Sequence, residues 1–370
     1  STNNITTSVL GTYFLIYNAT DSHGNSADAK TRTVIVYQPK FTYEVDGSLG
    51  IIKLYENIGT ISNENLNTIL TSNGWNQSLD LKIIGINNNI VWTDFQFSYS
   101  THGKPNKLHI ENISLESSID DYAIYSRDTL TTMKDVDISG YSRTNITDTG
   151  GGALRIRSAD YSSENHDINN PTLSNVNITN CCRGIRIQDS TAAYIVNCSV
   201  NDVTDNALYF AAGSYTSTTG CTNCVFYNCT TSTVGQVAFM NIGGANNKFI
   251  NCDMSGSRGA AVGIYNTNGY IEISNCTFSN ANTIETTTPW GGNTDDFNGA
   301  AVGFSILSSD VSGYLFVHDC SFNSGDGSVF YKAQQEGTFE VFNNTINLSD
   351  FSDNILSVSY THLRAHETMA

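Results

Sequence analysis

The residues of this chain best suited to chemistry are arginines, tyrosines and planar polar side chains that recur at a regular spacing. Arginine donates paired hydrogen bonds to carboxylates, and an aromatic ring stacks on the apolar face of a sugar. On the outward side of a flat β-sheet such residues would form a carbohydrate-binding surface, to which Phe239 would add another ring. The candidate ligand-binding residues are Arg155, Arg157, Asp160, Arg186, Gln188, Asp189, Tyr209, Asn241 and Tyr265.

A second chemistry open to these residues is polysaccharide cleavage by a lyase. Arg155 or Arg186 would act as the general base, and Asp160 and Asp189 would hold Ca²⁺ beside it. No motif enforces this arrangement, so the catalytic residues stay unassigned, and no metal or other cofactor is expected unless a lyase takes Ca²⁺. The plainer alternative is a solvated face whose charges pair across neighbouring strands.

The nine cysteines fall into two groups. Five share one position of a repeat and are expected to be free and buried, because stacked parallel neighbours hold their Cβ atoms farther apart than a disulfide allows: Cys198, Cys229, Cys252, Cys276 and Cys320. Two alternatives stay open for the other four, a disulfide that clasps an insertion over 211–224 or a zinc site: Cys181, Cys182, Cys221 and Cys224.

The composition restricts the partners of the protein. Charged residues make up only 14% of the chain, and the formal net charge is −17, which should repel nucleic acid and anionic membranes. The same charge disfavours strongly anionic polysaccharides unless a local basic patch overrides it. No apolar run is long enough for a membrane span, so we expect no membrane insertion.

The elements that would position these residues repeat about every 22 to 24 residues. One line of the repeat places Asn or Asp between apolar residues, and a second line about ten residues later reads Ala-apolar-x-apolar, as in Ala153-Leu154-Arg155-Ile156. Two strand patterns in phase at a fixed period predict an all-β fold, a right-handed parallel β-helix. The Asn/Asp positions are Asn112, Asp135, Asn175, Asn197, Asn228, Asn251, Asn275 and Asp319.

The Asn/Asp positions need no function to explain them. At a bend, each side chain can bond to its equivalent on the next coil and form a ladder. Function is expected instead where the repeat is interrupted, in the insertions 145–152 and 283–299, which would wall a groove along the face that carries the candidate residues.

Residues 80–357 resemble the pectate-lyase-like superfamily of parallel β-helices. That superfamily includes lyases, hydrolases, phage tailspikes and adhesins, so the resemblance implies a fold more than an activity. Asn293-Thr294-Asp295-Asp296 is similar to one element of the polygalacturonases, but the later elements of that family do not follow in order.

The two ends of the chain differ from the repeat. Residues 1–38 contain GTY-x5-ATDSHGNSA and TRTVIV and resemble the last strands of a bacterial immunoglobulin-like module, which implies export and further strands upstream. Residues 39–79 are expected to be a linker with a capping helix near 62–72, whose apolar face is Leu66, Ile69 and Leu70. Residues 358–370 resemble a translated sequencing adapter and are expected to lie outside the β-helix.

Three functions fit these observations. The first is a secreted or cell-surface protein, adhesin-like, that binds carbohydrate on an outward sheet face. The second is a polysaccharide lyase or glycoside hydrolase that acts in a groove, and the third is a structural filament or fibre component. The expected location is extracellular or at the cell surface, the expected partner is a glycan or cell-surface polymer, and the oligomeric state stays open.

Overall fold

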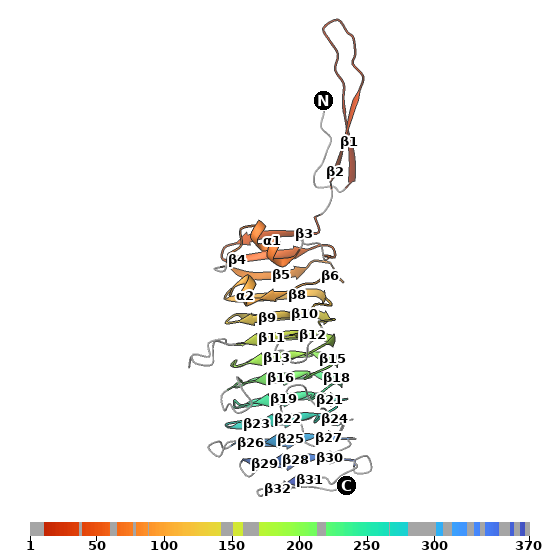
Figure 1. Ribbon diagram of the computed structural model, residues 1–370. Coiled ribbons are helices and arrows are strands. Elements are labelled where there is room, and N and C mark those ends of the chain that lie inside the picture. The colour runs from red at the N-terminus through yellow and green to blue at the C-terminus, as the bar shows by residue number, and fades with distance from the viewer. Residues whose placement is uncertain are drawn as a thin grey trace.

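The computed structural model describes residues 11–36, 39–59, 65–76, 79–87, 89–141, 151–157, 170–212, 220–265, 267–279, 301–305, 313–323, 329–333, 337–347, 356–358 and 363–366. These residues form a solenoid of stacked coils from which an N-terminal hairpin projects (Figure 1). The described residues include two short helices, α1 (Leu66–Ser72) and α2 (Tyr99–His102).

One side of the solenoid is a ten-stranded sheet in which each strand pairs in parallel with its equivalent on the next coil. Most of its strands are short and follow the Ala-apolar-x-apolar line of the repeat, which confirms that line as a strand. The strands are β7 (Phe97–Ser98), β9 (Tyr122–Arg127), β11 (Gly152–Arg157), β13 (Ile185–Gln188), β16 (Leu208–Ala211), β19 (Phe239–Ile242), β22 (Val262–Tyr265), β25 (Val302–Ser305), β28 (Phe330–Ala333) and β31 (Leu356–Val358).

The other side begins with seven N-terminal strands, of which β8, β10 and β12 run through the Asn/Asp bend, and continues with shorter strands before and after the bend. The N-terminal strands are β3 (Phe41–Asp46), β4 (Leu49–Leu54), β5 (Asp80–Gly85), β6 (Val91–Thr93), β8 (Lys107–Glu116), β10 (Leu130–Ser139) and β12 (Thr172–Cys181). Before the bend lie β14 (Tyr194–Val196), β17 (Val225–Tyr227), β20 (Asn247–Ile250), β23 (Tyr270–Ser274), β26 (Tyr314–His318), β29 (Thr338–Phe342) and β32 (Leu363–His366). After it lie β15 (Ser199–Val203), β18 (Thr230–Val234), β21 (Asp253–Ser255), β24 (Thr277–Ser279), β27 (Ser321–Phe322) and β30 (Thr345–Ile346).

The Asn/Asp column lies at a left-handed bend, as the repeat predicts. Its nine members have φ between 52° and 56°, a conformation that Asn and Asp tolerate better than most residues, and they include Asn343 beyond the predicted set. Asn228 Nδ2 donates to Asn197 Oδ1 at 2.7 Å, and Asn251 Nδ2 donates to Asn228 Oδ1 at 3.0 Å. The predicted ladder of amide hydrogen bonds is therefore confirmed.

Stacked apolar side chains fill the interior. Phe226 packs against Phe210 and against Phe249, its equivalent on the next coil, with ring centroids 4.3 Å and 5.8 Å away. Like residues stack on like because parallel pairing places each position above its equivalent. This single cluster of buried residues runs from Ile52 to Val341.

All nine cysteines are buried free thiols. The five column cysteines line the core as predicted, and the Cys276 backbone N–H donates to Cys320 Sγ at 3.4 Å. The disulfide alternative for Cys181, Cys182, Cys221 and Cys224 is wrong, and within the described residues no group of three or more His, Cys, Asp or Glu side chains could hold a metal ion. Burial raises the pKa of Cys181 to about 12, which keeps this thiol protonated.

The N-terminal end is covered as predicted. Helix α1 buries Leu66, Ile69 and Leu70 against the first coil, although its cap is Asn65, whose side chain accepts from the Thr68 N–H at 2.8 Å. The parallel stack starts earlier than residue 80, because the alternating side chains of Leu49–Leu54 let β4 pair with β5 in parallel.

The hairpin and the tail lie at the two ends of the chain. Strands β1 (Gly11–Tyr17) and β2 (Lys30–Val36) pair in antiparallel register, and Phe14 and Ile35 are exposed. Residues 11–36 therefore form a β-hairpin, while the resemblance of this segment to an immunoglobulin-like module stays a prediction. At the other end, β32 pairs in parallel with β29, so residues expected to lie outside the solenoid extend it. Leu363-Arg364-Ala365-His366 alternates apolar and polar residues, and this alternation suits a strand at an open edge.

Candidate functional site

The outward face of the ten-stranded sheet carries a row of arginines and tyrosines on consecutive coils. Parallel register places Tyr125 of β9 beside Arg155 of β11, Arg155 beside Arg186 of β13, and Arg186 beside Tyr209 of β16. We call these four residues the arginine–tyrosine ladder. The sequence analysis proposed its last three members as candidate residues, and the structure brings them together on one face.

Each guanidinium of the ladder lies near an aromatic ring. Arg155 Cζ is 4.6 Å from the centroid of Tyr125, and Arg186 Cζ is 5.1 Å from the centroid of Tyr209. Arg155 Nη2 also donates to Gln188 Oε1 at 3.1 Å, and Gln188 Nε2 donates to Asp189 Oδ2 at 3.2 Å. Rings and amides therefore hold the arginines in place and leave their positive charge in the site.

The electrostatics of Arg155 favour a negatively charged ligand. Burial and the neighbouring Arg186 charge both lower the pKa of Arg155. No carboxylate among the described residues forms an ion pair with Arg155, and its Nε–H is buried without a hydrogen-bond acceptor. An anion bound at the accessible end of the guanidinium would offset the repulsion between the two guanidinium groups.

A buried ion pair borders the ladder. Arg183 Nε donates to Asp205 Oδ2, and Arg183 Nη1 donates to the Tyr122 hydroxyl at 3.4 Å. Burial alone would lower the pKa of Arg183, but the Asp205 carboxylate outweighs it and raises this pKa. Gly152 is required beside this pair, because a Cβ at residue 152 would lie 2.8 Å from Arg183 Cβ.

Four residues around the site are not among those predicted from the sequence: Tyr122, Tyr125, Arg127 and Arg183. The first three belong to β9, in the same register as β11. Ala123-Ile124 repeats the Ala153-Leu154 pattern on the preceding coil, so extending the second line by one coil would have found them.

Asn241 does not face outward, so its prediction as a ligand-binding residue on the outward face is wrong. Asn241 pairs with Phe210 and with Ile264, both core positions, and it is fully buried. Its amide donates to the Gly243 carbonyl at 2.9 Å and accepts from Asn247 Nδ2 at 2.8 Å. Phe239 points inward for the same reason, because the outward residues of β19 lie one position later, at 240 and 242.

The predicted face is less open than a flat exposed surface. Tyr209 and Tyr265 are buried together in an outward apolar cluster that also contains Met240 and Ile242. The side chains of Arg157, Gln188 and Asp189 are likewise buried, at 8%, 0% and 5% exposure, whereas Arg155 and Arg186 are partly exposed. The accessible part of the site is therefore centred on these two arginines.

Two parts of the prediction lie outside the described residues. Asp160 is one, and the other comprises the two insertions that would wall the groove, apart from Gly151 and Gly152. The groove and the contribution of Asp160 stay predictions.

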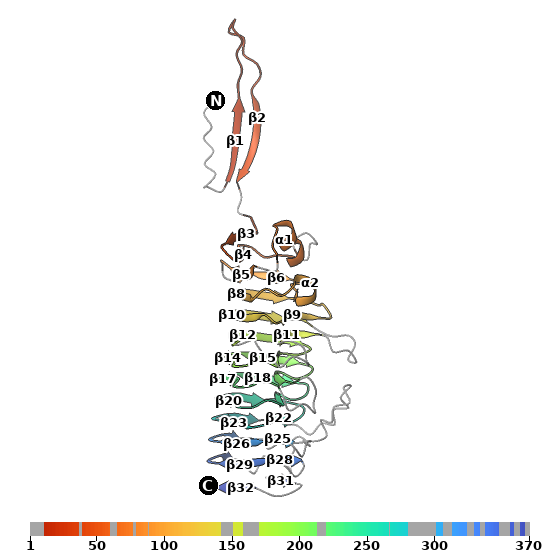
Figure 2. The same cartoon turned by 90° about the vertical axis from the view of Figure 1, so that its left-hand side faces the viewer.

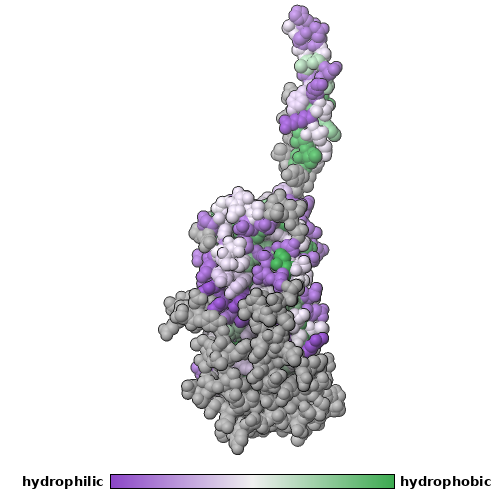
Figure 3. Space-filling view, viewed as in Figure 1, coloured by the Kyte–Doolittle hydropathy of each residue, from purple (hydrophilic) through white to green (hydrophobic). Residues whose placement is uncertain are grey.

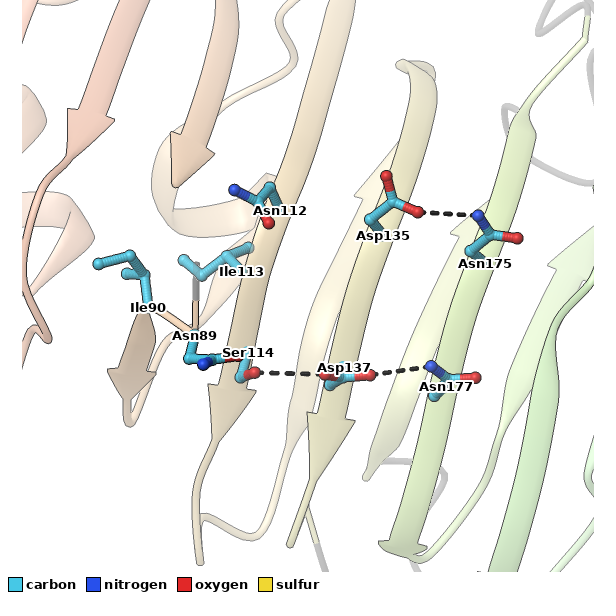
Figure 4. Close-up of a pocket in the computed structure, with 9 residues that line it drawn as sticks. All are labelled: Asn89, Ile90, Asn112, Ile113, Ser114, Asp135, Asp137, Asn175 and Asn177. Atoms are coloured by element: carbon cyan, nitrogen blue, oxygen red, sulfur yellow. Dashed lines mark hydrogen bonds between the residues drawn. The ribbon is translucent and has the colours of Figure 1, made fainter. Parts of the chain in front are cut away.

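A second polar feature lies on the far side of the solenoid, at the Asn/Asp bend. A groove of about 230 Å³ runs past Asp135 and Asp137, and their carboxylates accept from Asn175 Nδ2 at 2.8 Å and Asn177 Nδ2 at 2.9 Å (Figure 4). These acids are members of hydrogen-bonded ladders, so the groove is explained by the architecture of the bend.

Comparison with known families identifies the fold. Residues 97–278 match the family described as the right-handed β-helix region. This part of the chain is a right-handed β-helix. The match includes β7 to β24, so the arginine–tyrosine ladder belongs to the β-helix proper. No curated protein and no solved structure matches the chain.

Within the described residues, no helix has the length and apolar character needed to span a membrane.

Proposed function

We propose that the β-helix binds acidic carbohydrate through the arginine–tyrosine ladder. The observation that carries the proposal is the pair Arg155 and Arg186, which are adjacent on neighbouring coils, are each placed near a tyrosine ring, and are both partly exposed. Guanidinium groups bond carboxylates in a fork geometry, and tyrosine offers both a ring and a hydroxyl to a sugar.

The local charge supports an acidic ligand in spite of the acidic chain. The formal net charge is −17, yet three consecutive strands, β9, β11 and β13, carry Arg127, Arg155, Arg157 and Arg186 on one face. Arg157 is buried and Arg127 Nε lies 3.7 Å from the Asp128 carboxylate, so Arg155 and Arg186 supply the accessible positive charge. This is the local basic patch that a negatively charged polysaccharide would require. The two ladder arginines lie one coil apart, a step of about 4.8 Å, which is close to the length of one sugar ring.

The biological setting of the proposal is an adhesin-like protein that is secreted or held at the cell surface. A chain rich in uncharged polar residues, a long rigid rod and a projecting hairpin all suit contact with an extracellular polymer. Binding at Arg155 and Arg186 would then attach the rod to an acidic glycan.

Binding to soluble uronate polymers tests the proposal. Titration calorimetry with polygalacturonate and with alginate at low salt should give binding that weakens as salt rises, because the contacts are charge-assisted. A neutral dextran is the matched polymer control. If neither uronate binds, the proposal is wrong.

The lowered pKa of Arg155 favours a second candidate, a uronate lyase. An arginine that loses its proton more readily can remove the proton beside a uronate carboxylate, and elimination then leaves an unsaturated sugar. Ultraviolet absorbance of that product, measured with and without Ca²⁺, tests this candidate. Binding without any absorbance change on either polymer excludes it for these substrates.

A further inference from the structure

The outward face of the strands before the Asn/Asp bend changes character along the rod. On the coils of β5, β8, β10 and β12 this face carries Ile84 and seven polar residues: Lys82, His109, Glu111, Thr132, Lys134, Thr172 and Ser174. On the next six coils the same face carries an aromatic strip, which consists of Tyr194, Val196, Val225, Tyr227, Ile250, Tyr270, Tyr314, Phe316 and Phe342. Figure 2 shows the strands that carry it, β14, β17, β20, β23, β26 and β29, stacked along the left-hand side of the rod.

The change occurs within a continuous register. Thr172 pairs with Tyr194, and Ser174 pairs with Val196, so a ring and an aliphatic side chain replace two hydroxyls between one coil and the next. Tyr194, Tyr227 and Tyr314 are 43%, 39% and 44% exposed. Exposed tyrosine rings on a flat sheet face are suited to stacking on the apolar faces of sugars.

The charges within the strip compensate one another. Lys248 Nζ lies 2.8 Å from Glu272 Oε2, and the Tyr270 hydroxyl donates to the same oxygen at 2.7 Å. Lys248 Nζ is also 5.7 Å from the centroid of Tyr270. The strip therefore combines rings with a paired lysine and glutamate, and its chemistry differs from that of the arginine–tyrosine ladder. Glu340, which pairs in register with Phe316, adds a carboxylate to this face that disfavours an anionic polymer.

The dimensions of the strip decide between kinds of partner. Six coils at about 4.8 Å and three residues at about 3.3 Å give a footprint of roughly 29 by 10 Å, or about 290 Å². A stable protein interface needs about 800 Å² on each partner. A second copy of this chain would also bring its own charge of −17 against this one. A strip this long and narrow fits one extended polymer chain.

We infer that the aromatic strip binds a neutral polysaccharide that lies along the axis of the rod. The apolar faces of the sugars would stack on the exposed tyrosines, and their hydroxyls would bond Glu272 and Lys248. This site is on a different face from the ladder and does not depend on the proposed function. The rod would then hold an acidic and a neutral glycan on separate faces.

Two substitutions test whether the strip binds a polysaccharide, and each introduces a residue type that occurs at the equivalent position of another coil. Tyr194→Thr and Tyr227→Ser introduce the residue types found in the same columns at Thr172 and Ser174, so the strands keep a sequence suited to this face. Thr132→Ala changes the same face on a polar coil and is the matched control. Native gels that contain mixed-linkage β-glucan, galactomannan or arabinoxylan measure binding as retardation of the full chain.

The expected result is that at least one neutral polymer retards the wild type and the Thr132→Ala variant. Each tyrosine substitution should weaken that binding roughly 2- to 10-fold, and the Arg155→Met variant should bind the neutral polymer like the wild type. The inference is overturned if none of the three polymers retards the wild type, or if retardation survives the double substitution. Self-association by light scattering that the double substitution abolishes would also overturn it, since the strip would then be a dimer interface. If circular dichroism shows that the double variant does not fold, the binding of the two single variants serves as the test.

Discussion

Replacing Arg155 by Met should separate binding from stability. The substitution removes the cation near Tyr125 and the hydrogen bond to Gln188, and each contact contributes about 1 kcal/mol. It also removes the repulsion between Arg155 and Arg186. At a coil step of about 4.8 Å this repulsion is roughly 1 kcal/mol in a water-like medium and roughly 3 kcal/mol at an effective dielectric constant near 20. The losses and gains nearly cancel, so the free energy of unfolding should change by no more than about 1 kcal/mol.

Binding should respond far more strongly than stability. A charge-assisted hydrogen bond contributes about 1.5 to 3 kcal/mol, so the affinity for polygalacturonate or alginate should fall roughly 10- to 150-fold. Titration calorimetry measures the affinity, and urea denaturation followed by circular dichroism measures the free energy of unfolding.

The control for charge is Lys134→Met, which removes one positive charge from the exposed face of another sheet. This variant should bind the acidic polymer like the wild type. If Arg155→Met destabilises the fold by more than about 2 kcal/mol and leaves the affinity unchanged, Arg155 is a structural residue and the reasoning fails.

Three further predictions concern the fold. Asn228→Ala should lower the free energy of unfolding, measured by urea denaturation, by about 1 to 2 kcal/mol more than Asn228→Gly. Both variants lose the ladder hydrogen bonds to Asn197 and Asn251, but only alanine is strained at φ 52°. Equal losses of stability in the two variants would contradict this account. The native protein should react with less than one equivalent of a thiol-specific reagent and with all nine thiols in denaturant, since the cysteines are buried and free. The hydrogen bond from His109 and the charges of Lys82 and Lys134 lower the pKa of Glu111 below 4.5, so this carboxylate stabilises the fold above pH 4.5 and less as the pH falls. The stability difference between the wild type and Glu111→Gln should therefore shrink between pH 5 and pH 3; a difference that is constant over this range would refute the role of the charge.

The columns of the fold could be predicted because each position of a parallel stack meets its own equivalent. Asn at 228 and 251, and Cys at 252 and 276, repeat one coil apart, and they lie in the ladder and in the core as expected. The hydrophilic face of the N-terminal coils follows equally from the alternation of polar residues (Figure 3).

The candidate site was harder to predict from the sequence. Alternation along a strand distinguishes side chains that point into the core from side chains that point away from it, but it does not show whether an outward side chain is exposed to solvent. Tyr265 points away from the core and is still buried in a second apolar cluster. In Phe239-Met240-Asn241-Ile242 apolar residues occupy both sides of the strand, so the sequence does not show which side faces the core. Asn241 was therefore assigned to the outward side, although it is buried in the core.

The coil-by-coil pairing of the solenoid also bears on how such a chain changes length. Each strand of the ten-stranded sheet bonds only to the coils directly before and after it. Loss or duplication of a whole unit, such as the 23 positions from Asn228 to Asn251, would rejoin equivalent positions and leave every column intact. Loss of a single residue would turn one strand's core side chains toward solvent. Evolution can therefore lengthen or shorten this rod in whole coils, and each coil gained or lost would alter how many sugar units a face can span.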